Sequence, residues 1–454
     1  MGSHRGALKQ ALREAVRDGR LAPGTRLPPY RALAVDLGLA RNTVADAYAE
    51  LVAEGWLTAR QGSGTRVAER IMPTRTTRIP EKAPRRPADP AHNLAQGQPD
   101  ASSFPRTAWL ASARRALTAA PNEAFGPGDP QGRVELREAL AGYLARVRGV
   151  RTSPDQIVVC SGVAHALRLL FGEHVLRGPL AVEAYGLPFH RGLLEAAGVR
   201  TTPLGIDRDG TRVEDLASAA PRPRAVLLTP AHQFPTGGPL LPSRRTAAVD
   251  WARAHGGLVI EDDYDGEFRY DREPVGAVQG LDPEHVVYLG SVSKSLSPAV
   301  RLGWMVLPER LVDPVLAAKG LREGWTGVPD QLTLADLIES GSYDKHIRRT
   351  RHRYRERRNR LVAGLAEQAP HLEVTGIAAG LHAVLRLPPG TEAATVEAAN
   401  REGIALDGLA AFRHPAASTP HTDGLVIGYA APPDHAYTAA LEALLRVLPP
   451  PSEP

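Results

Sequence analysis

Three residues that could do chemistry lie in the second half of the chain, two of them just behind short apolar runs. Lys294 stands among small residues behind Val286–Leu289, and a lysine amine so placed can form a Schiff base with a carbonyl compound. Asp262 comes shortly after Leu258–Ile260, and its carboxylate could pair with the protonated nitrogen of a pyridine ring. Arg301 follows the lysine, and its guanidinium fork matches the oxygens of a phosphate. Each residue alone has commoner roles, such as a surface lysine or a metal-binding carboxylate. An earlier strand end at Cys160 runs into Ser161–Ala164, where the N–H groups at a helix start can hold a phosphate. This segment, the Asp262 segment and the Lys294 segment with Arg301, in this order along the chain, predict a site for pyridoxal phosphate.

Short apolar runs alternate with helical patterns over residues 93–454, which is typical of an α/β domain with a largely parallel sheet. Six runs are predicted to form buried strands: Ile157–Cys160, Leu180–Val182, Ala225–Leu228, Leu258–Ile260, Val286–Leu289 and Leu302–Leu307. Ligands of such sheets bind beyond the carboxyl ends of the strands. The elements therefore place the three residues where a ligand is expected.

The composition indicates a protein of more than one domain. The chain has 454 residues, of which 43% are hydrophobic, too many for a disordered protein. Cys160 is the single cysteine, which excludes an internal disulfide and fits a reducing compartment. No run of 18 apolar residues and no apolar signal region are present, so we expect a cytoplasmic protein without a membrane span. The histidines lack metal-ligand spacing, and we predict no metal.

The positive charge is concentrated at the start of the chain. The first 70 residues hold 11 Lys/Arg against 7 Asp/Glu, residues 71–92 hold 5 against 2, and the whole chain carries only +5. This distribution is expected of a nucleic-acid-binding head on a neutral body, although charge alone leaves a solvated basic surface as an alternative.

The head has the pattern of a helix-turn-helix followed by a wing. Apolar residues at helical spacing predict helices around 8–16, around 30–37 and from 41 onward, with a tight glycine turn at Gly38. Two β-prone stretches within 56–67 flank a glycine-rich turn and predict a hairpin.

The segment LAPGTRLPPYRALAVDLGLARNTVADAYAELVAEGWLTARQGSGTRV resembles the winged-helix domain of GntR-type regulators, which we place at residues 1–68. The resemblance implies that the start of the recognition helix enters the major groove of DNA, where Arg41 could bind guanine and Asn42 adenine. The implied DNA-binding residues are Arg31, Arg41, Asn42, Thr43, Gly62 and Ser63. One departure is Ala40, where relatives carry a Ser or Thr that caps the recognition helix. The missing side-chain cap costs roughly 1 kcal/mol of stability.

Residues 93–454 resemble the fold-type-I aminotransferase-like domain of the MocR subfamily of GntR-type regulators, with a small subdomain from about 330. The segments that carry the resemblance are NLAQGQPDASSFP, GPGDPQG, TPAHQFPTG, EDDYDGEFRY and SVSKSLSPAVRLGW. The resemblance implies that Lys294 forms the internal aldimine, that Asp262 binds the pyridine nitrogen and that Tyr264 binds the phenolic oxygen. It implies that the phosphate is held by Gly162, Val163, Ala164, Ser291, Ser293 and Arg301. It also implies a homodimer.

Two departures from the family weaken the case for amino-acid turnover and leave cofactor binding intact. Relatives stack an aromatic residue on the cofactor ring, where our alignment places Leu187, with Tyr185 as the alternative. Aminotransferases also clamp the substrate carboxylate with a late arginine, and the corresponding segment His421–Ala430 contains none.

Two basic stretches have more than one interpretation. Residues 69–92 are rich in Pro and Arg and predict an extended linker, either a passive spacer or an added source of DNA affinity. The run Lys345–Arg360 predicts one long helix, whose charges serve either a solvated face between subdomains or a second DNA contact.

These features predict a dimeric transcription regulator that binds double-stranded DNA and senses pyridoxal phosphate or an amine or amino-acid effector through an aldimine at Lys294. One alternative is an active pyridoxal-phosphate-dependent aminotransferase with an accessory DNA-binding domain. Another is a DNA-binding protein whose pyridoxal site is only structural.

Overall fold

The computed structural model describes residues 4–60, 64–69, 90–126, 128–270, 275–320 and 326–451. The chain divides into two compact units, residues 1–88 and 89–454, here called the head and the body. Over the described ranges, no helix combines the length and the apolar content that a membrane span requires.

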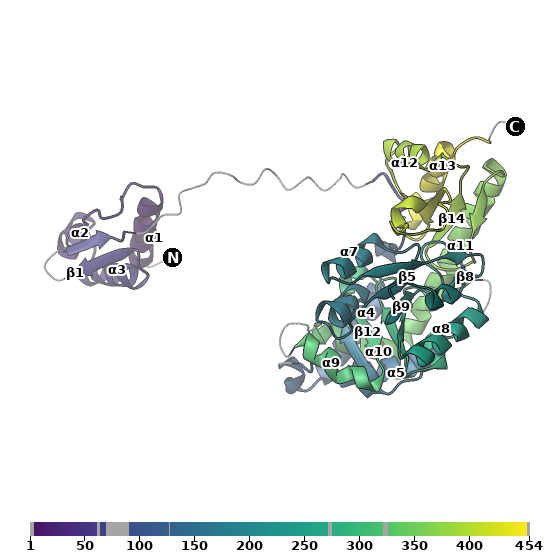
Figure 1. Cartoon of the computed structure of the whole chain (residues 1–454). Helices are drawn as coiled ribbons and strands as arrows, with labels where there is room; N and C mark the ends of the chain where they lie inside the picture. The colour runs from purple at the N-terminus through teal and green to yellow at the C-terminus, as the bar shows by residue number, and fades with distance from the viewer. Residues whose placement is uncertain are drawn as a thin grey trace. The chain divides into compact units, whose positions relative to one another are not determined.

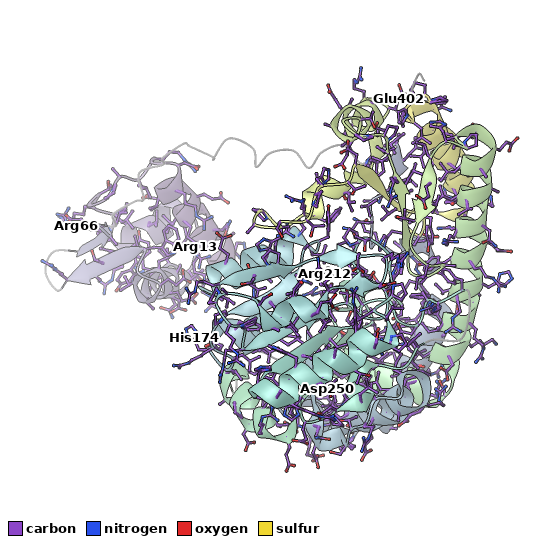
Figure 2. The ribbon with its side chains drawn as sticks, turned by 45° about the vertical axis from the view of Figure 1, so that its right-hand side comes forward. Arg13, Arg66, His174, Arg212, Asp250 and Glu402 are labelled. Carbon is purple, nitrogen blue, oxygen red and sulfur yellow. The ribbon has the colours of Figure 1, made fainter. Side chains whose placement is uncertain are left out.

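The head is a three-helix unit with a β-hairpin, as the sequence predicted. The helices are α1 (His4–Arg17), α2 (Tyr30–Asp36) and α3 (Arg41–Ala53), and the hairpin pairs β1 (Leu57–Arg60) with β2 (Gly64–Val67). Their apolar faces share one core, formed by Leu8, Leu27, Ala34, Val44, Ala47, Tyr48, Leu51, Leu57 and Val67. Arg66 of β2 and Arg13 of α1 lie on opposite sides of the head (Figure 2). The hairpin therefore extends the helical unit as a wing.

The body is built on a seven-stranded sheet with the order β4-β12-β11-β10-β9-β5-β6. The strands are β4 (Ile157–Cys160), β5 (Leu180–Glu183), β6 (Thr201–Leu204), β9 (Ala225–Leu228), β10 (Leu258–Asp262), β11 (Val286–Ser291) and β12 (Gly303–Val306). All six predicted strands are present. Every neighbouring pair is parallel except those of β12, which runs antiparallel to β11 and β4.

Helices cover both faces of this sheet, which explains why its strands are continuous apolar runs. Val158 packs in one cluster with Leu194 of α7 (Pro188–Ala196), whereas Val226 packs in another with Trp251 of α8 (Pro242–His255). These two helices lie on opposite faces of the sheet (Figure 1). The other helices of this part are α4 (Arg106–Ala119), α5 (Val134–Arg148), α6 (Val163–Leu167), α9 (Glu309–Lys319) and α10 (Val328–Glu339).

The C-terminal part begins with α11 (Ser342–Gln368), the single long helix that the basic run predicted. A second sheet of order β13-β14-β17-β16 follows. Its strands are β13 (Glu373–Thr375), β14 (His382–Arg386), β16 (Asp407–Gly408) and β17 (Gly424–Gly428), and its helices are α12 (Glu392–Arg401) and α13 (Tyr437–Val447). The second sheet gathers with α12 and α13 at one end of the body, whereas the long α11 extends along its side (Figures 1 and 2). The short strand β3 (His92–Asn93) pairs with β15 (Ile404–Ala405) and ties the start of the body to it.

Candidate functional site

A cavity of about 600 Å³ lies beyond the carboxyl ends of β4, β10 and β11. It is lined by all nine residues that the sequence predicts for a cofactor: Gly162, Val163, Ala164, Asp262, Tyr264, Ser291, Ser293, Lys294 and Arg301. Their elements are adjacent in the sheet or follow its strands directly. The parallel topology therefore gathers residues that are far apart in the sequence.

Lys294 reaches into the cavity from the turn that follows β11. Its Nζ donates a hydrogen bond to the carbonyl oxygen of Gly97. A Cβ atom at Gly97, whose φ is +67°, would lie 3.1 Å from that Nζ, so a larger residue would crowd the amine. Burial lowers the pKa of Lys294 below its usual value, against the attraction of Asp262 and Asp265. A lowered pKa enlarges the neutral, nucleophilic fraction of the amine.

Asp262 ends β10 at the floor of the cavity and is 7% exposed. Its Oδ1 is buried and has no hydrogen-bond partner among the described residues. Burial raises the pKa of this carboxyl to about 7, and the negative charge of Asp263 adds to the shift. Buried polar atoms of folded proteins are nearly always hydrogen-bonded. A protonated ring nitrogen would supply the missing partner, so the residues present fit a pyridine cofactor.

The titration of Asp262 has a testable consequence for stability without added ligand. Because its pKa is raised from about 3.9 in an unfolded chain to about 7, the folded protein holds this proton more tightly. The stabilising contribution is therefore complete below pH 4 and is lost as the pH rises through 7. We expect wild type to lose stability relative to Asp262→Asn over this window, by at most about 1.4 kcal/mol per pH unit. Urea unfolding of both proteins at several pH values measures this difference in the free energy of unfolding. If the two free energies changed in parallel with pH, the raised pKa of Asp262 would be contradicted.

The phosphate end of the cavity is formed by unusual backbone and by one arginine. Gly162 has φ +108° and turns the chain from β4 into α6. Arg301, with φ +55°, is one of two non-glycine residues in the described chain with positive φ. Over the same ranges, no acidic side chain forms a salt bridge with Arg301. Its guanidinium is thus available to an anion.

Tyr264 belongs to a hydrogen-bonded chain at the side of the cavity. Its hydroxyl lies 3.0 Å from Nδ1 of His232, which in turn lies 2.8 Å from Oδ2 of Asp265. Burial, with the charge of Asp265, raises the pKa of Tyr264 well above its usual value. The tyrosine therefore remains protonated and can donate a hydrogen bond to a ligand oxygen.

Both candidates for the stacking position line the cavity, together with a third residue that the sequence did not single out. Tyr185 is 5% exposed, and its hydroxyl lies 3.5 Å from Nδ1 of His421. Leu187 precedes the first turn of α7, and His190 follows one turn later. Burial lowers the pKa of His190 to about 4, and the charge of Lys294 contributes. No sequence motif marks His190, and its place in the cavity becomes evident only from the direction of α7.

The late segment His421–Ala430 contributes no guanidinium to the cavity. His421 instead lies 3.3 Å from the carboxylate of Glu392 and 3.6 Å from that of Asp423. The three could approach one metal ion, but the carboxylates already accept backbone N–H groups: those of Ala410 and Gly424 on Glu392, and that of residue 392 on Asp423. The grouping serves to fix this loop.

The head presents its predicted DNA-binding residues at the surface. Arg41 and Asn42 are exposed at the start of α3, and Thr43 is half-buried beside them. Ala40 precedes this helix without a side-chain cap, as expected from its sequence. Arg31 is exposed on α2. The predicted wing residues Gly62 and Ser63 lie outside the described residues.

Comparisons with known proteins agree with this division. The family model "Bacterial regulatory proteins, gntR family" matches residues 5–67, and "Aminotransferase class I and II" matches residues 90–444. A pyridoxine biosynthesis regulator of Corynebacterium glutamicum, PdxR, is 32% identical over 93% of this chain and 91% of its own. A probable rhizopine catabolism regulatory protein of Rhizobium meliloti, MocR, is 32% identical over 93% and 89%.

The body also resembles solved aminotransferases. The crystal structure of a kynurenine aminotransferase from Pyrococcus horikoshii in complex with PMP has a TM-score of 0.71 and is 25% identical. The match covers 79% of this chain and 91% of that enzyme. A GntR-type head precedes an aminotransferase-like body, and full-length relatives share both parts. The chain therefore belongs to the MocR subfamily of GntR-type transcription regulators.

Proposed function

We propose that the protein is a homodimeric, cytoplasmic regulator that binds pyridoxal phosphate in its body and changes its binding to double-stranded DNA in response. The signal is the cofactor itself or an amine or amino-acid effector that reaches the same cavity. The observation that carries the proposal is that Oδ1 of Asp262, which finds no hydrogen-bond partner in the described part of the chain, lies in one cavity with Lys294 and Arg301. A pyridine nitrogen, an aldehyde and a phosphate are the three groups that these side chains suit.

Each of the nine predicted cofactor residues then has a role. Lys294 would hold the aldehyde end of the cofactor, because its buried amine is placed to form a Schiff base there. Asp262 would hold the ring nitrogen, and Tyr264 would donate a hydrogen bond to the phenolic oxygen. The phosphate is held by Gly162, Val163, Ala164, Ser291, Ser293 and Arg301.

The head provides the DNA-binding response. Two heads of a dimer would bind two half-sites of an operator, with the start of α3 in the major groove. The relatives PdxR, a regulator of pyridoxine biosynthesis, and MocR, a probable regulator of rhizopine catabolism, support a small-molecule signal. The residues between head and body would transmit the change.

The deciding experiment compares cofactor-free and pyridoxal-phosphate-loaded protein on DNA from upstream of its own gene. Salt must be fixed, because affinity for DNA depends steeply on it. We expect loading to change the affinity or the footprint. Equal binding by both forms would exclude the cofactor as signal, and absence of specific binding by either form would refute the regulator.

Arg41→Ala should weaken binding to that operator by about 1–3 kcal/mol, roughly 5- to 150-fold, because a bidentate contact to a base edge is lost. Binding to random DNA should fall much less. Arg20→Ala is the matched control: it removes the same charge from the head, at a surface ion pair with Asp18 outside α3. A fluorescence titration at one salt concentration measures both variants. Equal losses on operator and random DNA would contradict a base contact by Arg41.

The second candidate function is an active aminotransferase, favoured by the joint presence of Lys294, Asp262 and Tyr264 in the cavity. Turnover of an amino acid and a keto acid at about 1 per second or faster would support it.

A further inference from the structure

Three Lys or Arg side chains line the cavity over the part of the chain that the structure describes: Lys294, Arg301 and Arg191. The proposed function uses the first for the aldehyde and the second for the phosphate. Arg191, on α7, has no role in that scheme. No predicted site motif includes Arg191, so the sequence alone does not single it out.

The guanidinium of Arg191 is held by backbone and not by a counter-ion. Its Nη1 donates to the carbonyl oxygens of Gly186, at 2.7 Å, and Phe412, at 2.8 Å. Within the described ranges, its Nη2 and Nε have no hydrogen-bond partner, and no carboxylate forms a salt bridge with it. The side chain is half-buried, and burial lowers the pKa of Arg191 below its usual value.

An arginine in this state favours an anion. Two neutral carbonyl groups fix its direction but leave the positive charge uncompensated, and an unpaired charge away from water is unfavourable. The two remaining nitrogens of the guanidinium, Nη2 and Nε, can each donate a hydrogen bond to a carboxylate. The arrangement differs from that of Arg148, whose guanidinium pairs with Asp263.

The position of α7 brings this charge into the same space as Lys294. His190 precedes Arg191 on the first turns of the helix, lines the cavity and is close enough to Lys294 for its pKa to be affected. The cavity walls near α7 are largely apolar, with Val182, Leu187 and Leu227 among the lining residues. A ligand that spans Lys294 and Arg191 would therefore have an amine end, a short aliphatic middle and an anionic end.

We propose that Arg191 binds the carboxylate of the effector, so that the effector is an amino acid whose amine lies at Lys294. Arg191 would thus take the role of the late arginine that the segment His421–Ala430 lacks. This inference rests on the proposed function, since it assumes that the cofactor occupies the cavity.

The test uses full-length, pyridoxal-phosphate-loaded protein and three matched pairs of probes: glycine with methylamine, β-alanine with ethylamine, and γ-aminobutyrate with propylamine. Each pair differs only by the carboxylate. Titration followed by the visible absorbance of the cofactor gives an apparent affinity for each probe. For at least one pair, wild type should bind the amino acid about 10- to 100-fold more tightly, as expected for charge-assisted hydrogen bonds.

Arg191→Gln should reduce this ratio to near 1, and Arg191→Lys should retain part of it because the charge remains. Arg208→Gln, at a side chain that is 93% exposed, is the control and should keep the wild-type ratio. A structural role of Arg191 alone would weaken both members of a pair equally and leave the ratio unchanged.

Three results would overturn the inference: a ratio near 1 for every pair in wild type, an unchanged ratio in Arg191→Gln, or a loss in that variant of cofactor affinity alone. Wild-type protein that never acquires the cofactor's absorbance would instead refute the proposed function.

Discussion

Lys294→Ala is expected to abolish the visible absorbance that the protein acquires with pyridoxal phosphate, because that absorbance requires a Schiff base to a lysine amine. The chain has five lysines, and among the described ones burial lowers the pKa of two, Lys294 and Lys319. Lys319 is the competitor: burial lowers its pKa to about 8. Its Nζ, however, donates to the carbonyl oxygens of Pro130 and Val159 and does not line the cavity. Spectra of the variant after removal of excess cofactor measure the effect.

Borohydride reduction followed by peptide mass mapping identifies the modified lysine directly. We expect the added mass on the peptide that contains Lys294. The exposed Lys345 is the control, and Lys345→Ala should retain the full absorbance. Modification of Lys319, or absorbance that persists in Lys294→Ala, would contradict the site.

The strands could be predicted from the sequence, as could the cavity residues Asp262, Lys294 and Arg301, because both predictions depend on local patterns. β4 and β10 are buried on both faces of the sheet, so each is a continuous apolar run whose end can be recognised. Asp262 and Lys294 follow such ends, and parallel topology brings those ends together. The fold of the head could be predicted equally well, since the apolar spacing of α1 and α3 reflects one shared core.

Contacts between distant segments could not be predicted in the same way. Arg191 owes its place to the carbonyl group of Phe412, and His232 owes its partner Asp265 to the packing of two loops. The basic run shows the same limit. It predicted α11, but not that Arg357 is 3% exposed and pairs with Asp434. Charge density indicates a helix without indicating which arginines turn inward.

Arg148→Ala is expected to destabilise the body by about 3–5 kcal/mol, the loss typical when one member of a buried ion pair is removed. Arg148 and Asp263 are each 2% exposed at their side chains, and two hydrogen bonds of 2.6 and 2.8 Å join them. The guanidinium also donates to the carbonyl oxygens of Val275 and Gly266. Its removal leaves a buried carboxylate with the hydroxyl of Tyr288 as its remaining side-chain donor. Urea unfolding measures the loss.

The double variant Arg148→Ala/Asp263→Ala separates the pair from its surroundings. Because it also removes the stranded carboxylate, it should be destabilised by less than the sum of the two single variants.

The single variant Arg148→Ala should in addition bind pyridoxal phosphate more weakly at pH 7. The negative charge of Asp263 already contributes to the raised pKa of the adjacent Asp262. Loss of the Arg148 cation would leave that charge uncompensated, so that less of the Asp262 carboxylate would be ionised to meet the ring nitrogen. Additive losses with unchanged cofactor affinity would show that this ion pair neither acts as a unit nor supports the site beside it.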